Sequence, residues 1–156
     1  MSNARKLWEV IQTRGARRTI GRMLFLGAQG VCHPFSYAAS VDASEEGMLL
    51  VEAFAEGGGR NAPTLPTIRF AREDMALVGF RADHQLLFGH AVILLAPVLS
   101  SESVAGALQA ARLIRGRRLR VDHFVALLNM GNGKDELELL RNSIRHHIFP
   151  LESILC

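Results

Sequence analysis

The feature that most constrains the fold is the apolar run from Ala91 to Leu95, which has no polar side chain on either face. A strand with this pattern has to be covered on both sides of a sheet. Beyond it, the spacing of apolar residues predicts a helix from Ser103 to Leu113 and another from about Lys134 to Arg141, and apolar runs predict strands at Val121 to Leu128 and His146 to Phe149. Strands that alternate with helices pair in parallel through right-handed crossovers, so this half of the chain predicts an α/β fold with a parallel sheet.

The N-terminal half predicts further helices and strands. A helix is expected from Ala4 to Thr13 with Gly15 as its stop, and another from Gly47 to Glu56 with Ser44 as its N-cap. Short apolar runs predict strands at Met23 to Leu26, Phe35 to Val41, Thr67 to Ala71, Met75 to Phe80 and Gln85 to Phe88.

The length of the chain indicates one domain. Its 156 residues are enough to bury a single hydrophobic core. The one clear stretch rich in glycine and proline, Gly57 to Pro66, is too short to join two domains and is expected to be a surface loop. Residues 1–156 are therefore predicted to form a single domain.

Composition argues against several classes of partner. The net charge of +3 comes largely from two arginine clusters that few aromatic residues accompany, which disfavours nucleic acid as a partner. No apolar stretch approaches the ~18 residues of a membrane span, and the N-terminus lacks the pattern of a signal peptide. Two cysteines, Cys32 and Cys156, form neither a disulfide framework nor a zinc-ligand spacing. We therefore expect a cytoplasmic protein with no membrane partner.

Hydroxyl side chains follow the central apolar strand where a ligand would be expected. Ser100, Ser101 and Ser103 lie between that strand and the helix after it. In a parallel sheet this position presents the backbone N–H groups of a helix N-terminus to anions, so the segment is a candidate phosphate cradle. Serines in this position more commonly act as a simple N-cap, and that role stays open.

The same segment resembles the orotate-type phosphoribosyltransferases, which have the type I phosphoribosyltransferase fold. In that family a strand ends in two acidic residues, followed by two apolar residues, Thr-Thr-Gly and a helix. The corresponding residues here are Ala96 and Pro97, then Val98 and Leu99, then Ser100, Ser101 and Glu102.

Other segments occur in the order that the family shows. Leu7 to Leu26 is similar to its opening helix and strand, and Phe70 to Phe80, with Gly89 after it, is similar to its flexible-loop hairpin. The remaining similar segments are Gly30, His33, Ser36 and Tyr37 in the hood region, and Phe124 to Leu128, Gly131 to Leu140 and Ile148 to Ile154 at the end. The resemblance implies an α/β, three-layer, phosphoribosyltransferase-like fold with a shortened parallel sheet. A homodimer is expected, because a shortened sheet exposes an apolar edge that a partner could cover.

Two departures from the family bear on activity. The acidic pair is missing, and Gly57 to Pro66 stands where the family has a strand and a pyrophosphate-binding turn. Loss of charge stabilisation at the reacting centre raises the barrier by several kcal/mol. The leading hypothesis is a non-catalytic protein that binds a phosphate-bearing nucleotide or ribose ligand at Ser100, Ser101, Glu102 and Ser103. It assigns no catalytic residue, no metal ligand and no cofactor other than magnesium carried by a pyrophosphate ligand.

Two alternatives stay open. One is a weakly active orotate-type transferase of nucleotide metabolism, with Tyr37 against the base and Arg72 toward the pyrophosphate. That alternative needs an acid near the ribose, which only Glu102, Glu73 or Asp74 could supply. The other is a protein-interaction module that binds no small molecule.

The remaining motifs have simpler interpretations. The six histidines, at positions 33, 84, 90, 123, 146 and 147, show no metal-ligand spacing and are expected to be surface or capping residues. Gly131 to Asp135 is expected to be a helix-capping turn rather than a phosphate loop. A thiol of Cys32 activated by His33 is disfavoured, because neighbouring side chains on a strand point apart.

Overall fold

The computed structural model describes residues 5, 9, 12–41, 44–59, 63–74, 76–82, 84–129, 138 and 140–148. Their strands form one six-stranded sheet in the order β3-β2-β1-β4-β5-β6. All neighbouring pairs are parallel except β2 and β3, which form an antiparallel hairpin at one edge. The strands are β1 (Tyr37–Ser40), β2 (Thr67–Glu73), β3 (Ala76–Ala82), β4 (Val92–Leu99), β5 (His123–Asn129) and β6 (Arg145–Ile148).

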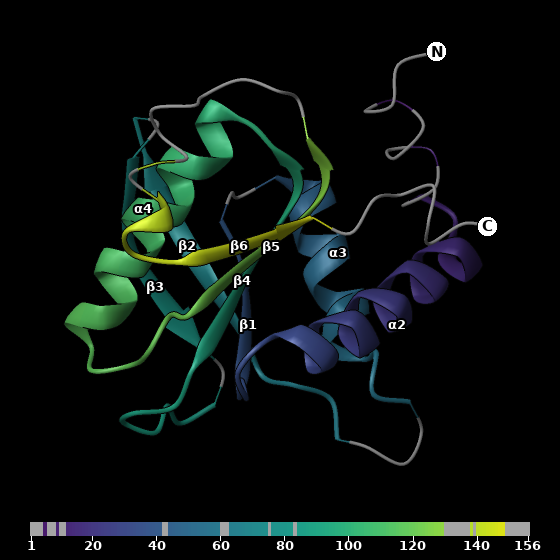
Figure 1. The fold of residues 1–156 in the computed structure, drawn as a ribbon, viewed down its shortest axis with the longest axis horizontal. Coiled ribbons are helices and arrows are strands. Elements are labelled where there is room, and N and C mark those ends of the chain that lie inside the picture. Colours follow the sequence, from purple (N-terminus) through teal and green to yellow (C-terminus); the bar gives the residue numbers. More distant parts are fainter. Residues whose placement is uncertain are drawn as a thin grey trace.

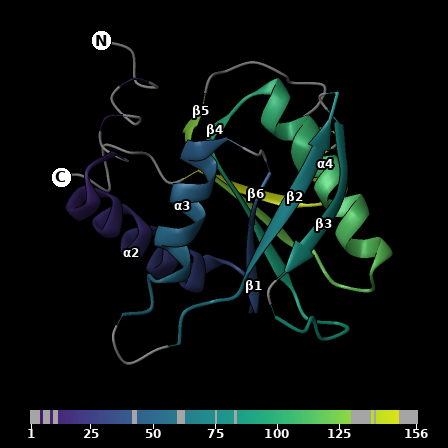
Figure 2. The same cartoon turned by 180° about the vertical axis from the view of Figure 1, so that it is seen from behind.

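Helices cover both faces of the sheet, which makes three layers. On one face lie α2 (Arg14–Val31) and α3 (Glu45–Ala55), and on the other lies α4 (Ser101–Gly116) (Figure 1). The view from behind shows the same separation of α2 and α3 from α4 (Figure 2). The predicted three-layer α/β fold with a mostly parallel sheet is therefore confirmed. No helix among the described residues is both long and apolar enough to cross a membrane.

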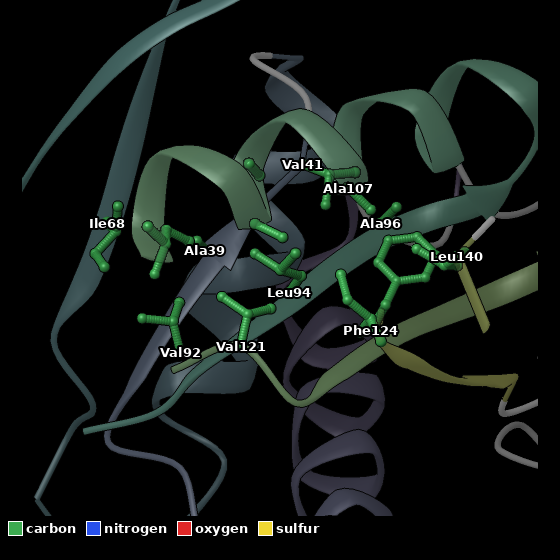
Figure 3. Packing of buried hydrophobic residues seen from close by; sticks show 14 of the residues in the cluster. Ala39, Val41, Ile68, Val92, Leu94, Ala96, Ala107, Val121, Phe124 and Leu140 are labelled. Carbon is green, nitrogen blue, oxygen red and sulfur yellow. The ribbon is translucent and has the colours of Figure 1, made fainter. Parts of the chain in front are cut away.

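Strand β4 explains why the sheet needs cover on both sides. Its alternate residues Val92, Leu94 and Ala96 lie on the side of α4, in one cluster with Ala107 of α4 and Phe124 of β5 (Figure 3). The residues between them, Ile93 and Leu95, belong to a second cluster that contains residues of α2 and α3. Each fully buried aliphatic side chain of this kind contributes about 1.5–3 kcal/mol to folding. The central strand is thus covered on both faces, as its sequence predicts.

The predicted strand from Met23 to Leu26 is wrong, because this segment lies in the middle of α2. The longer pattern explains the helix: Ile20, Leu24 and Ala28 recur at intervals of four and are buried, while Met23 and Leu26 are 44% and 48% exposed. The four-residue run alone has no period that separates a strand from a helix.

Two smaller predictions in the first half also fail. Gly15 does not stop a helix but lies inside α2, where Thr19 Oγ1 donates a hydrogen bond to its carbonyl oxygen over 3.1 Å. The strand expected from Gln85 to Phe88 is absent from the described residues there, which run as an irregular loop to Gly89. Gly89 has a φ of 80°, a left-handed conformation that glycine adopts without strain.

The other elements agree with the sequence pattern within a few residues. Helix α3 begins after Ser44, whose hydroxyl accepts a hydrogen bond from the Gly47 N–H over 3.0 Å. The expected strands at the positions of β1, β2, β3, β5 and β6 are present, and the helix expected from Ser103 corresponds to α4. The helices expected over 4–13 and 134–141 lie mostly outside the described residues.

Candidate functional site

The order of the strands identifies one end of the sheet as the candidate ligand site. From β1 the chain passes through α3 to β2 on one side, and from β4 it passes through α4 to β5 on the other. Because β1 and β4 are parallel neighbours, their carboxyl ends lie at the same end of the sheet. From there α3 and α4 pass to opposite faces (Figure 1). Open α/β sheets bind their ligands at such a switch point.

The serines at the start of α4 form a reciprocal capping box. The Ser100 hydroxyl accepts a hydrogen bond from the Ser103 N–H over 3.2 Å, and the Ser103 hydroxyl accepts one from the Ser100 N–H over 2.8 Å. Ser103 is buried and also donates to the Ser100 carbonyl oxygen, so both hydroxyls serve the helix itself. The N–H groups of Ser101 and Glu102 are the first-turn donors that this cap does not use. An anion at this end of the sheet would therefore accept hydrogen bonds from backbone N–H groups rather than from serine hydroxyls.

Ala96 and Pro97, which the sequence resemblance aligns with an acidic pair, are part of the sheet. Ala96 pairs with Ala126, and the pairing continues at Val98 and Leu99, so β4 extends past both positions. Ala96 is 1% exposed and packs in the cluster under α4, and Pro97 is also buried. A carboxylate at position 96 would have to be buried without a partner, which costs several kcal/mol.

The start of α3 completes the switch point. Ser40, 2% exposed, ends β1, and the Val41 N–H donates a hydrogen bond to the Leu95 carbonyl oxygen over 3.0 Å. Helix α4 approaches this segment closely, because a Cβ placed on Gly106 would lie 2.8 Å from the Val41 carbonyl oxygen. Acidic side chains occupy the first turns of both helices, at Glu45, Glu46 and Glu102. They suit the positive end of a helix, and they would repel a phosphate that carried no cation.

Tyr37 lies at the opposite end of the sheet from these serines. It begins β1 and pairs with Val92, the first residue of β4, whereas Ser100 follows the last. The length of β4 separates the two levels by about 23 Å. The Tyr37 hydroxyl accepts a hydrogen bond from the Leu87 N–H over 2.9 Å, and its ring is 4% exposed. A base held against Tyr37 would therefore lie far from a phosphate held at the Ser100 segment, and the role expected for Tyr37 stays a prediction.

Arg72 lies at the same end of the sheet as the serines. Ile68 of β2 pairs with Ala39 of β1, which in turn pairs with Leu94 of β4. Arg72, four residues after Ile68, therefore lies level with Val98. Two strand spacings, about 10 Å, separate β2 from β4. The Arg72 side chain is exposed at the end of the β2–β3 hairpin, beside Glu73. The structure thus places Arg72 and the start of α4 at the same end of the sheet.

The end of the sheet opposite the switch point holds a cluster that no sequence pattern predicted. One ligand atom each of Cys32, His123 and His147 lies within 4.8 Å of the other two. Residues 32, 123 and 147 are far apart in the sequence, so no local spacing could reveal the cluster. The signal that was available is the pair of histidines facing each other across two predicted parallel strands.

The buried location sets the protonation of this cluster. Burial lowers the pKa of His123, and the neighbouring His147 and His33 lower it further, against a smaller opposing effect of Asp122. Burial also raises the pKa of the Cys32 thiol to about 11. Cys32 is thus a protonated thiol at neutral pH, which agrees with the expectation that His33 does not activate it.

Comparison with known proteins identifies the fold. No protein-family model matches the chain, and no curated protein matches its sequence. Among solved structures it is similar to the orotate phosphoribosyltransferase of Mycobacterium tuberculosis in complex with 5-phospho-alpha-D-ribosyl 1-diphosphate, with a TM-score of 0.66 and 13% identity over 96% of this chain and 82% of that chain. It is also similar to Leishmania donovani UMP synthase, with a TM-score of 0.65 and 18% identity over 96% of this chain. The adenine phosphoribosyltransferase of Leishmania donovani gives a TM-score of 0.63 and 13% identity over 89% of this chain.

The likeness concerns the fold and not the base. The chain spans 30% of the UMP synthase chain and 66% of the Leishmania adenine phosphoribosyltransferase chain. Structures of orotate and adenine enzymes match it with closely similar scores. The chain therefore has the fold of the phosphoribosyltransferases, which it shares with the orotate and the adenine enzymes alike.

Proposed function

We propose that this protein binds a magnesium-bearing ribose phosphate or nucleotide phosphate at the switch point between β1 and β4, without transferring the phosphoribosyl group. The observation that carries the proposal is the pairing of a preserved helix start after β4 with buried Ala96 and Pro97 at the acidic positions. The helix start that would bind phosphate is present, and the acidic pair that would serve the chemical step is replaced.

Phosphate would be held by the backbone. The N–H groups of Ser101 and Glu102 lie at the positive end of the α4 dipole, which favours an anion. Arg72, exposed at the same edge, would add a cation toward a second phosphate of the ligand. Glu45, Glu46 and Glu102 would hold the ligand's magnesium through oxygen atoms, the ligand type that this cation prefers.

The chemical step would lack its main stabilisation. An oxocarbenium-like transition state needs negative charge beside the ribose, and Ala96 presents only a methyl group, buried under α4. Loss of one such electrostatic partner costs roughly 10²–10³-fold in rate. We therefore expect binding to survive where turnover does not.

Calorimetric titration with phosphoribosyl pyrophosphate, with and without magnesium, tests the binding. Micromolar affinity that depends on magnesium is expected. No heat under either condition would contradict the proposal and favour a protein-interaction module. Magnesium-dependent consumption of orotate or adenine by the pure protein would contradict the non-catalytic part and favour an active transferase.

A pair of variants at Ser101 isolates the backbone contribution. Ser101 is the first residue of α4, where proline is well tolerated, and Ser100 has the extended conformation that proline requires before it. Ser101→Pro removes one N–H donor, so affinity should fall about tenfold, the effect of one hydrogen bond to a charged group. Ser101→Ala loses the same hydroxyl but keeps the N–H, and should bind like the wild type. Equal affinity of the two variants would contradict phosphate binding at this helix start.

A second pair tests the arginine. Arg72→Ala should weaken binding, whereas Arg81→Ala, an exposed arginine at the other end of the same hairpin, should not. If both variants weaken binding equally, the effect is one of net charge and not of a contact at the switch point.

A further inference from the structure

The cluster of Cys32, His123 and His147 draws one side chain from each of three elements. Cys32 is the C-cap of α2, and its N–H donates a hydrogen bond to the Ala28 carbonyl oxygen over 2.8 Å. His123 begins β5, and His147 lies in β6 at the edge of the sheet. All three lie at the end of the sheet opposite the start of α4, so the cluster is separate from the switch point.

The register of β5 and β6 explains why the two histidines face the same way. His147 pairs with Val125, and His123 is two residues before Val125 on the same strand. Residues two apart on a strand share a face, and Val125 packs in the cluster beneath α2 and α3. Cys32 packs against that same cluster where α2 ends. The thiol and both imidazoles therefore converge on one face of the sheet.

We propose that Cys32, His123 and His147 form a binding site for Zn²⁺. The His123 Nδ1 and His147 Nε2 atoms are 2.9 Å apart, and one ligand atom from each of the three residues lies within 4.8 Å of the others. In a tetrahedral zinc site two imidazole nitrogens are about 3.4 Å apart, and a sulfur and a nitrogen about 3.5 Å. The nitrogens need to separate by about 0.5 Å, and the sulfur, which lies within 4.8 Å of each nitrogen, needs to approach by about 1.3 Å at most.

The donor set selects the kind of metal. One sulfur and two imidazole nitrogens suit a borderline-soft cation such as zinc, whereas magnesium and calcium require oxygen ligands. Three protein ligands leave a fourth position for water. His123 is 3% exposed, but Cys32 and His147 are half-buried, and a groove of about 200 Å³ lined by His33, Asp122 and Arg145 lies beside them. Two of the three side chains, those of Cys32 and His147, are therefore partly accessible from solvent.

One hydrogen bond has to open when the metal binds. The His33 N–H donates to His123 Nε2 over 2.9 Å, so the proton of neutral His123 lies on Nδ1, shared with His147. Zinc at Nδ1 would require that single proton to move to Nε2, where it would meet the His33 N–H. Residues 33–35 belong to no helix or strand, so the His33 amide can turn away. The amide signal of His33 should consequently shift when zinc binds.

The charges around the site partly offset each other. Arg145 and Asp122 both line the groove beside the cluster, where Arg145 would oppose a cation and Asp122 would favour one. Asp122 is also paired with Arg120 over 2.6 Å. The thiolate that forms on zinc binding therefore supplies the main negative charge, and binding should release protons.

Metal titration of the full-length protein without a polyhistidine tag tests the site. Zinc should bind at one equivalent after treatment with a chelator, and cobalt should give the near-ultraviolet absorption of a thiolate–metal bond. Cys32→Ser should abolish this absorption, and His147→Asn should weaken zinc binding by about 100-fold or more, since loss of an outer partner alone costs roughly 10–100-fold. Zinc should also raise the melting temperature of the wild type and not that of Cys32→Ser.

Two controls keep the outcome unambiguous. Cys156→Ser removes the other cysteine, and His84→Asn removes an exposed histidine outside the cluster, so both should bind zinc like the wild type. The proposal is overturned if the wild type binds no zinc at one equivalent, or if Cys32→Ser binds it as tightly as the wild type. A cobalt thiolate signal that disappears in Cys156→Ser instead would also overturn it.

Discussion

Gly21 of α2 lies directly against the backbone of Ala53 of α3, and a Cβ on Gly21 would overlap the Ala53 carbonyl oxygen. The neighbouring residues Leu24 and Phe25 then pack into the cluster that contains Leu50 and Phe54. The two helices on this face of the sheet are thus held at a separation that only glycine at position 21 permits.

Gly21→Ala should therefore destabilise the protein, although alanine favours helices. The overlap is with backbone, so α2 and α3 would have to separate, at a cost of about 1–3 kcal/mol. Gly30→Ala is the matched control, since it lies in the same helix with open space around it and should be neutral or stabilising by up to about 1 kcal/mol. Urea denaturation of both variants measures the difference. Equal stability of Gly21→Ala and Gly30→Ala would show that the helices are not in backbone contact.

Ser100→Ala should lower the free energy of unfolding by about 1 kcal/mol, because it removes the cap on the Ser103 N–H. Ser100→Asp keeps a side-chain oxygen at the cap and should remain within a few tenths of a kcal/mol of the wild type. Thermal denaturation of the two variants checks this. Loss of stability in both would mean that the hydroxyl itself, and not the cap, is required.

Ala96→Asp should not restore activity and should destabilise the protein by several kcal/mol, since the carboxylate would be buried without a partner. Burial raises the pKa of such an acid above its value in the unfolded chain. The unfolded state then loses its proton first, so the destabilisation should grow as the pH rises above about 4. Ala105→Asp, on the exposed side of α4, is the control and should show little of this pH dependence. Denaturation series at several pH values test the prediction, which fails if both variants lose stability equally at every pH.

Tyr37→Phe should cost about 1 kcal/mol, because the Leu87 N–H loses its acceptor. Binding of phosphoribosyl pyrophosphate should be unchanged, because Tyr37 lies at the far end of the sheet from α4. Denaturation and calorimetry on the same preparation give both values. Weakened binding in a variant that is otherwise folded would return Tyr37 to the ligand site.

Arg115 joins α4 to two other parts of the chain through its guanidinium group. It donates to the Val121 carbonyl oxygen over 2.7 Å and to the Ser143 carbonyl oxygen over 2.8 Å. Arg115→Lys keeps the charge but loses the fork geometry, so stability should fall by about 1 kcal/mol. The same change at exposed Arg112 should have no measurable effect in urea denaturation.

The pattern of local residues was sufficient for much of the architecture. The uninterrupted apolar run at Ala91 to Leu95 requires cover on both faces, and the alternation of strands and helices after it requires parallel pairing, so the layers of the fold follow from the sequence. Ser44 was predictable as an N-cap for the same reason, because capping involves residues three positions apart, and for the serines after β4 a cap was one of two roles left open. The error at Met23 to Leu26 arose where a short apolar run has no period of its own, and its conformation depends on Ile20 and Ala28 being buried together.

Only the tertiary structure decided which side chains share a site. The sequence orders Tyr37, Arg72 and Ser100 along one chain, but strand register places Tyr37 at one end of the sheet and the other two at the opposite end. Cys32, His123 and His147 are brought together by the pairing of β5 with β6 and by the point at which α2 ends. Local patterns depend on hydrogen bonds and burial within a few residues, whereas these sites depend on the order and register of strands, which long-range pairing sets.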